Sequence, residues 1–249
     1  MRQSALECGC TEKDLLRSEN TVALSAPVDG ARCYLRLPHI CNLVSYGAGV
    51  VATLQPGLEA PMREYMEKYS SAGGCFETPA LHEFTRLLQP YGAAPCFMAE
   101  YFLPDIKKLR SRRCRYTVRR LAKEEFAGLY LPEWSNALCA KRKEYDIMAF
   151  GAYDGEKLIG LAGASADCEK MYQIGIDVLS EYRHQGVASA LTSRLARQIL
   201  KEGKVPFYCA AWSNLASVRN ALRSGFVPAW VELTAKSTDF IQQMNEQKA

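Results

Sequence analysis

A turn of small and cationic residues at positions 183–189 has the residue types that bind phosphate, and it lies between two apolar segments. The segment before it, 171–179, is apolar and β-branched enough to form a buried strand. After it, apolar residues recur every four positions, the spacing of one helical face: Val187, Leu191, Leu195 and Ile199. The sequence therefore predicts a strand, a tight turn and a helix in succession.

The first turn of such a helix would offer unpaired donors to an anion. Its leading backbone N–H groups have no intrahelical partner, and the positive end of the helix dipole points the same way. Gly186, Ala188 and Ser189 carry little or no side chain, and Arg183 adds a positive charge. We expect a phosphate group here; the alternative is a small-residue helix start that only packs closely on the sheet. A dinucleotide site is disfavoured, because its G-x-G-x-x-G motif needs three glycines and this turn has one.

Two motifs in this region resemble those of a known enzyme family. Residues 183–188, Arg-His-Gln-Gly-Val-Ala, follow a strand that ends in Ile-Asp-Val at 176–178. They resemble R/Q-x-x-G-x-G/A, the acyl-CoA-binding motif of the GNAT superfamily of N-acetyltransferases. Downstream, Asn-Leu-Ala-Ser at 214–217 and Arg-Ser-Gly-Phe at 223–226 resemble the N-x-x-[AS] and [KR]-x-G-F segments of that family, in the same order and spacing. The resemblance covers roughly residues 114–236.

The resemblance implies that acetyl-CoA is the co-substrate, with its pantetheine arm in a gap between the strand at 171–179 and the next strand. Main-chain groups around Val178 would contact the arm, and the amides of 184–189 would hold the pyrophosphate. Asn214 and Ser217 would lie beside the arm and the thiol; helix N-capping and first-turn packing are their alternative roles. The implied cofactor-binding residues are Ile176, Val178, Leu179, Arg183, His184, Gln185, Gly186, Val187, Ala188, Ser189, Asn214 and Ser217.

The positions that carry acid–base groups in many GNAT relatives hold other residues in this chain. Relatives place a glutamate on the motif strand or on the following one, and a tyrosine in the next helix. Aligned by the motifs, these positions hold Tyr172, Cys209 and Ala221. We take Tyr172 and Cys209 as the candidate catalytic residues, with packing in the sheet as the alternative for each. Asp177 and Glu133 are further candidates, as carboxylates that attract an amine.

An ordinary globular composition excludes several classes of protein. Of the 249 residues, 48% are hydrophobic and 23% charged, which argues against disorder. No apolar run approaches the ~18 residues that cross a bilayer. Glu7, Glu12 and Asp14 interrupt the N-terminal segment, which therefore lacks the apolar core of a signal peptide. We expect a cytoplasmic protein that does not associate with membranes.

A basic segment at 107–120 contains eight of the cationic residues and no acid, so the net charge of +4 becomes −4 over the rest of the chain. We interpret this segment as a solvated linker and strand edge; attraction of acidic ligands and binding of nucleic acid are the alternatives. Only Tyr116 places an aromatic ring among the charges, so we expect no nucleic-acid partner. The segment also marks the predicted domain boundary, with domains at 1–112 and 113–249.

The ten cysteines are expected to be reduced thiols. The chain is neither short nor apparently secreted, which disfavours a disulfide scaffold. Only Cys8 and Cys10 lie close together, and no Cys or His spacing supports a metal site. The chain has just three histidines, which disfavours a hydrolase with a Cys/His or Ser/His nucleophile.

The remaining pattern predicts an α+β fold in two parts. The smaller N-terminal domain, an accessory unit without recognisable chemistry, should contain helices at 1–16, 58–69 and 79–88 and strands at 21–25, 31–37, 40–45, 49–54 and 96–103. The second part should contain strands at 116–121, 147–153, 157–166, 171–179, 205–212 and 226–234, with helices at 122–130, from 132 through 143, after 186 and at 214–224. A polar tail should begin at Lys236. The order in the second part is that of a GNAT-like mixed central sheet with flanking helices.

The sequence thus predicts an acyl-CoA-dependent N-acyltransferase. The acyl group would be acetyl, passed from acetyl-CoA to a primary amine of a small molecule or peptide by direct attack on the thioester. The alternative is a catalytically silent CoA-binding sensor or interaction module, which the missing glutamates and tyrosine allow. Neither the acceptor nor the oligomeric state is specified by the sequence.

Overall fold

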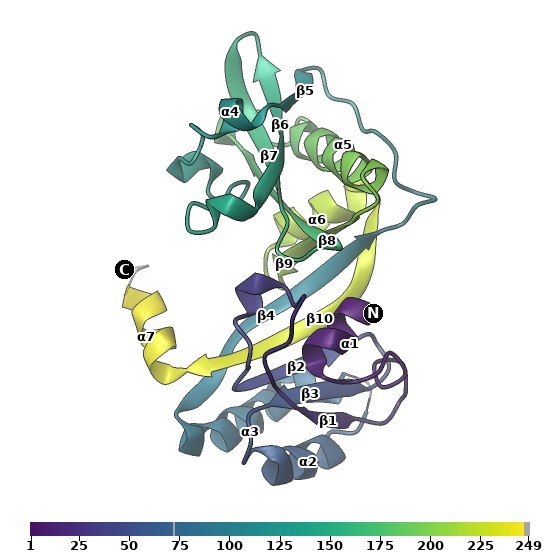
Figure 1. Cartoon of the computed structure of the whole chain (residues 1–249), viewed down its shortest axis with the longest axis vertical. Helices are drawn as coiled ribbons and strands as arrows, with labels where there is room; N and C mark the ends of the chain where they lie inside the picture. Colours follow the sequence, from purple (N-terminus) through teal and green to yellow (C-terminus); the bar gives the residue numbers. More distant parts are fainter. Residues whose placement is uncertain (72, 247–249) are drawn as a thin grey trace. The chain divides into compact units, whose positions relative to one another are not determined.

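Two compact units make up the chain in the computed structural model of Figure 1, which describes residues 1–71 and 73–246. One unit consists of Met1–Glu100 together with the segment from Trp230 onward, and the other of Tyr101–Ala229. These bounds differ from the predicted division at residue 112, because residues 231–235 pair with a strand of the first unit. The predicted functional division into 1–112 and 113–249 stays a prediction.

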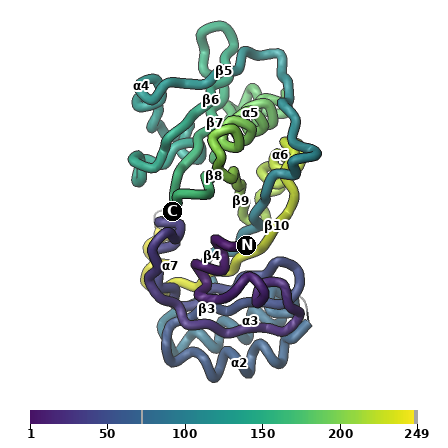
Figure 2. The backbone as a smooth tube through the Cα atoms, turned by 45° about the vertical axis from the view of Figure 1, so that its right-hand side comes forward, coloured from purple at the N-terminus to yellow at the C-terminus, as the bar shows by residue number. Residues whose placement is uncertain are grey.

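The first unit is a small sheet covered by helices. Its strands follow the order β1-β3-β2-β10, with β1 parallel to β3 and the other pairs antiparallel. Apolar side chains of β2 and β3 pack against α2 and α3, which lie together in both views (Figures 1 and 2). The elements are α1 (Arg2–Cys8), β1 (Thr21–Leu24), β2 (Cys41–Ser45), β3 (Val50–Leu54), α2 (Glu59–Lys68), α3 (Thr78–Leu88) and α7 (Thr238–Glu246). Two strands contribute residues to both units, namely β4 (Ala93–Pro104) and β10 (Phe226–Ser237).

Two expectations for this unit were wrong. The segment at 31–37 is not a strand but a 3-10 turn at Cys33–Leu35, followed by Arg36 in a left-handed conformation with φ 53°. Its conformation is set by the buried side chain of Arg32, which pairs with Glu7, rather than by pairing with a strand. The predicted polar tail contains α7, whose Phe240 packs edge-on against Phe97 with ring centroids 6.2 Å apart.

The second unit confirms the predicted α+β class with a mixed sheet and flanking helices. Its strands follow the order β9-β8-β7-β6-β5, with β8 and β9 parallel and the remaining pairs antiparallel. The predicted turn of β6 and β7 holds Gly155 with φ 60°. Apolar residues of α5 pack on these strands and form the core of the unit. The elements are β5 (Thr117–Leu121), α4 (Lys123–Phe126), β6 (Asp146–Asp154), β7 (Lys157–Ser165), β8 (Met171–Val178), α5 (Val187–Lys201), β9 (Val205–Ala211) and α6 (Leu215–Ser224).

The predicted helix from 132 through 143 is absent, and the one at 122–130 shortens to α4. In place of the former the chain forms 3-10 turns at Pro132–Trp134 and Lys143–Tyr145. Between these turns the backbone lies flat on β7 and β8, and Asp177 Oδ2 accepts the N–H groups of Asn136 and Ala137 at 2.8 Å each. Because a carboxylate of the sheet takes these two donors, Asn136 and Ala137 do not use them in helical hydrogen bonds.

The close approach of this segment depends on two paired glycines, Gly163 of β7 and Gly175 of β8. A Cβ atom on Gly163 would clash with the carbonyl oxygen of Ala137, and one on Gly175 with that of Asn136. Both obstacles are backbone atoms, so they move only if the segment is displaced. Because these two glycines have no side chain, the backbone of the segment can pack directly on the sheet.

Replacing either glycine by alanine should destabilise the protein. We expect Gly163→Ala or Gly175→Ala to lower the free energy of unfolding by about 1–3 kcal/mol, because overpacking forces backbone shifts. Gly128→Ala is the matched control, since a Cβ there meets no atom within 4 Å. Urea unfolding of the three variants measures the effect. Equal stability of Gly175→Ala and Gly128→Ala would contradict the close packing.

Candidate active site

Strands β8 and β9 are paired at one end only. Their register joins Met171, Tyr172 and Gln173 to Val205, Pro206 and Phe207. Both strands continue beyond this point, to Val178 and Ala211, but in the described residues they no longer pair with each other. The parted strand ends leave main-chain groups accessible within the sheet.

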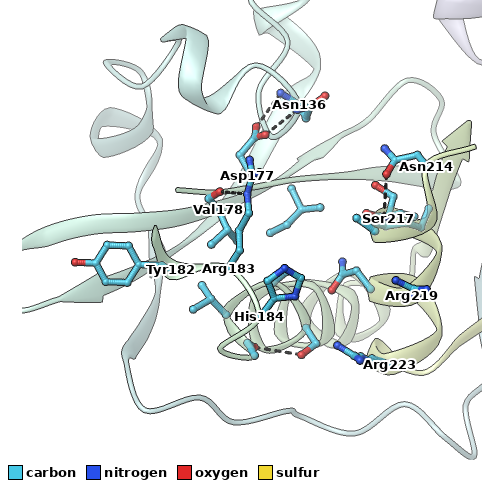
Figure 3. A pocket seen from close by; sticks show the side chains of 18 residues that line it. Asn136, Asp177, Val178, Tyr182, Arg183, His184, Asn214, Ser217, Arg219 and Arg223 are labelled. Atoms are coloured by element: carbon cyan, nitrogen blue, oxygen red, sulfur yellow. Dashed lines mark hydrogen bonds between the residues drawn. The ribbon is translucent and has the colours of Figure 1, made fainter. Parts of the chain in front are cut away.

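A pocket of about 500 Å³ opens where the strands part (Figure 3). Four parts of the unit contribute its walls: the segment after β5, the end of β8 with the turn into α5, β9, and α6 with the residues before it. The lining residues are Asn136, Ile176, Asp177, Val178, Tyr182, Arg183, His184, Gly186, Val187, Ala188, Ser189, Tyr208, Asn214, Ala216, Ser217, Arg219, Asn220 and Arg223.

The turn into α5 presents a row of unpaired backbone donors. His184 and Gly186 both have positive φ, 61° and 80°, and Gly186 is the residue before the first helical position. In the described part of the chain, the N–H groups of residues 184–189 have no protein acceptor. The first backbone bond of the helix is made by Ala190, to the carbonyl of Gly186 at 3.0 Å. Positive φ is rare outside glycine, so the left-handed backbone conformation of His184 is an unusual feature of this turn.

Side chains of the basic segment help to fix this turn. Gln185 Oε1 accepts bonds from the Tyr116 hydroxyl at 2.6 Å and from Arg115 Nη2 at 2.9 Å. Gln185 Nε2 donates to the carbonyl of Glu181 at 3.0 Å. The main chain of Arg112 donates to Ser193 of α5 at 2.9 Å. The segment at 107–120 thus contacts the helix whose N-terminus lines the pocket.

The pocket walls carry an excess of positive charge. Arg183, Arg219 and Arg223 line it, and Asp177 is the one carboxylate among the lining residues. Burial raises the pKa of Asp177, and bonds from Asn136 and Ala137 oppose this. Within the described chain, no carboxylate lies within ion-pairing distance of Arg219 or Arg223. Figure 3 shows these arginines on α6, across the pocket from Tyr182. Such walls suit an anionic ligand.

Most of the residues expected to bind a cofactor lie together in this pocket. Ten line it: Ile176, Val178, Arg183, His184, Gly186, Val187, Ala188, Ser189, Asn214 and Ser217. Leu179 and Gln185 do not, and the N–H of Leu179 is already bonded to the Ile159 carbonyl at 3.0 Å. Asn214 Oδ1 accepts the N–H of Ser217 at 3.1 Å, so its side chain caps α6.

The two candidate catalytic residues lie outside the lining. Cys209 Sγ accepts a bond from Gln173 Nε2 at 3.1 Å. The ring of Tyr172 is 5.9 Å from Lys204 Nζ. Glu133 is also outside the lining, whereas Asp177 belongs to it. The catalytic roles of Tyr172 and Cys209 stay predictions.

Sequence reasoning missed Tyr208, which is 2% exposed and lines the pocket from β9. Its ring lies near those of Phe102 and Phe226, at centroid distances of 6.5 and 6.2 Å. Burial raises the pKa of Tyr208, while hydrogen bonds with Ser217 and Asn220 act in the opposite direction. Alternation along the strand places Tyr208 and Cys209 on opposite faces, but the sequence does not show which face lines a pocket.

The structure shows no sign of a metal centre or a membrane span within residues 1–71 and 73–246. No group of three or more potential His, Cys, Asp or Glu ligands occurs there. No helix in that part has the length and apolar character to cross a bilayer. All ten cysteines are free thiols.

Comparison with protein families identifies the segment that contains this pocket. Residues 115–226 match the model of the acetyltransferase (GNAT) family. The resemblance recognised from the two motifs is thereby confirmed, and residues 115–226 form a GNAT acetyltransferase domain. A comparison with curated proteins found no match.

Several solved structures share part of the fold at low sequence identity. A GCN5-related N-acetyltransferase from Kribbella flavida is 13% identical, with a TM-score of 0.49, over 61% of this chain and 63% of that one. An acetyltransferase of the GNAT family from Colwellia psychrerythraea is 16% identical, with a TM-score of 0.46, over 74% and 76% of the chains. A GCN5-related N-acetyltransferase-like protein from Streptococcus suis is 16% identical, with a TM-score of 0.45, over 62% and 68%. Likeness at this level carries no argument about substrates.

Proposed function

We propose that the protein is an acyl-CoA-dependent N-acyltransferase that passes acetyl from acetyl-CoA to a primary amine of a small molecule or peptide. The observation that carries the proposal is the row of unpaired N–H groups at 184–189, which faces a pocket of about 500 Å³. A pyrophosphate supplies the acceptors that these donors lack, at the positive end of the dipole of α5. The free cysteine thiols suit the reducing cytoplasm, where we place the protein.

The chain's own residues fit the parts of CoA. The amides of 184–189 would bind the pyrophosphate, with Arg183, Arg219 or Arg223 adding charge-assisted bonds. Ile176 and Val178 lie in the half of β8 that pairs with β7 but no longer with β9, and a pantetheine arm would find main-chain partners on the side toward β9. The Val178 carbonyl also accepts a bond from Arg183 Nε at 3.2 Å, so this arginine connects the arm region to the phosphate turn.

Direct acyl transfer requires a neutral amine. The amine nitrogen forms a bond to the thioester carbon, the C–S bond breaks, and one proton of the nitrogen is finally replaced by the acyl group. Deprotonating a lysine-like amine at pH 7 costs roughly 4–5 kcal/mol, whereas an α-amino group costs about 1 kcal/mol. The one carboxylate of the lining, Asp177, is already bonded to Asn136 and Ala137, so it is not free to take the proton of the amine.

We therefore expect a preference for weakly basic amines. Initial rates of thiol release from acetyl-CoA should be higher with α-amino acids or peptide N-termini than with cadaverine-like diamines at pH 7. Raising the pH should favour the diamines more, because their neutral fraction grows tenfold per unit well below their pKa. A clear preference for diamines at pH 7 would contradict this expectation.

A catalytically silent CoA-binding protein is the second candidate. It is favoured by Ala221, which is fully buried at the position where GNAT relatives carry a tyrosine, and by the placement of Tyr172 and Cys209 outside the pocket lining. The same thiol assay separates the two candidates. A sensor would bind CoA without any amine-dependent release of thiol across the panel.

A further inference from the structure

One buried side chain of the pocket wall has a polar atom without a partner in the protein. Asn220 of α6 is 9% exposed and is among the lining residues. Its Nδ2 atom donates to Thr192 Oγ1 of α5 at 3.0 Å, and its Oδ1 atom has no hydrogen-bond partner in the part of the chain that the structure describes. Most buried polar groups in proteins are hydrogen-bonded, so an unpaired acceptor in a pocket wall requires an explanation.

The bond to Thr192 determines which atom of the amide is left for a ligand. Thr192 is fully buried in α5, so its hydroxyl holds the Asn220 side chain in one orientation. With the amide nitrogen bonded to α5, the carbonyl oxygen remains as an acceptor. An unpaired acceptor costs free energy, and a donor on a ligand removes that cost. Because Asn220 lines the pocket, a molecule bound there can supply this donor.

Ser224, four residues further along α6, has an unpaired oxygen that cannot serve a ligand in the same way. Its side chain is fully buried, and its Oγ atom also has no partner among the described residues. Unlike Asn220, it does not line the pocket. The helix thus carries two buried oxygens without partners, and only that of Asn220 is placed to meet a bound molecule.

The chemistry of CoA determines which part of the ligand can meet this oxygen. Its phosphate groups are anionic acceptors, so they gain nothing from a second acceptor. Donors lie on either side of the pyrophosphate, in the nucleoside and in the pantetheine arm. The arm carries the thioester and must enter the pocket, whereas the nucleoside takes no part in acyl transfer. Since Asn220 and its partner Thr192 are both buried, we expect this oxygen to face the arm.

We propose that Asn220 Oδ1 accepts a hydrogen bond from a donor of the pantetheine arm, either an amide N–H or the hydroxyl of the arm, when acyl-CoA is bound. The inference rests on the proposed acyltransferase function. It adds a binding residue that belongs to neither sequence motif, because position 220 lies between the segments 214–217 and 223–226. Asn220 binds the arm, and the backbone of 184–189 binds the pyrophosphate.

The test compares two ligands, CoA and the nucleotide fragment of CoA that ends at the pyrophosphate and so lacks the arm. Asn220→Leu replaces the amide by an apolar group of similar size. We expect its affinity for CoA, measured by titration calorimetry, to fall roughly tenfold, because a donor of the arm loses its partner. Its affinity for the fragment should equal that of the wild type. A merely structural role of Asn220 would weaken both ligands alike.

Ser224→Ala is the control, because it removes an unpaired buried oxygen of the same helix outside the pocket lining. Its affinity for both ligands should match the wild type. If Asn220→Leu does not fold, Thr192→Val keeps the asparagine but removes the hydroxyl that orients it. That variant should lose affinity for CoA, by a smaller factor, and none for the fragment.

Two results would overturn this inference and leave the acyltransferase proposal standing. One is unchanged affinity for CoA in the variant that folds, and the other is an equal loss for CoA and the fragment. If the fragment binds too weakly to measure, the loss for CoA relative to Ser224→Ala decides. Failure of the wild type to bind CoA would overturn both proposals.

Discussion

Gly186→Glu is expected to abolish binding of CoA while the domain stays folded. Gly186 precedes the first residue of α5, and a Cβ there would meet no atom closer than 3.7 Å. A glutamate at this position places a negative charge beside the unpaired N–H groups of 184–189, where the pyrophosphate should bind. The carboxylate both repels the phosphates and competes for the same donors. We expect affinity to fall at least roughly 100-fold, measured by titration calorimetry with CoA.

A matched control separates this effect from backbone strain. Gly203 lies just past the other end of α5 and has φ 72°, and a Cβ there would likewise meet no atom within 4 Å. Gly203→Glu therefore imposes a comparable left-handed conformation on a non-glycine residue without placing charge at the pocket. The conformational strain costs about 1–2 kcal/mol. Equal CoA affinity in Gly186→Glu and wild type, or equal losses in both variants, would contradict the assignment of the turn as the phosphate site.

Arg32→Met is expected to cause the largest loss of stability. The guanidinium of Arg32 is 2% exposed and forms ion pairs with Glu7 at 2.7 Å and with Glu232 at 2.9 Å. Its Nη1 atom donates to the Tyr34 hydroxyl at 2.6 Å. Removing the arginine leaves two buried carboxylates without a counter-charge. We expect the free energy of unfolding at pH 7 to fall by about 3–5 kcal/mol.

The deficit of Arg32→Met should depend on pH. A carboxylate stranded without its arginine favours the protonated form, so the folded variant binds more protons than its unfolded chain and loses stability as the pH rises. The gap between variant and wild type should therefore narrow from pH 7 toward pH 5 in urea unfolding. Lys68→Met, which breaks an exposed pair with Glu83, is the control and should change stability little. A loss for Arg32→Met as small as that control would show that the buried pair contributes little.

The phosphate-binding half of the site could be predicted from sequence because its parts are adjacent in the chain. Unpaired donors at the start of a helix follow from local geometry, and a run of small residues at 186–189 shows where that helix begins. The hairpin at Gly155 was predictable for the same reason, since Asp-Gly favours the tight two-residue turn of a β-hairpin. Both features depend on short-range rules.

On the opposite wall, Asn214 and Ser217 were predicted from the motif, but Tyr208 and Arg219 could not be, because their place depends on which faces of distant elements meet. Tyr208 and Cys209 are neighbours in sequence, and only the packed sheet shows that Tyr208 lines the pocket. Arg219 faces the same space from α6, at a position with no local signal. The segment near Asn136 failed as a helix prediction for a related reason, because Asp177 of β8 takes its backbone donors.

A crystal structure of the protein grown with CoA tests the central claim most directly. We expect pyrophosphate oxygens at hydrogen-bond distance, about 2.7–3.2 Å, from backbone nitrogens within 184–189. Density for the pyrophosphate elsewhere on the protein, with those N–H groups turned toward solvent or toward the protein itself, would contradict it.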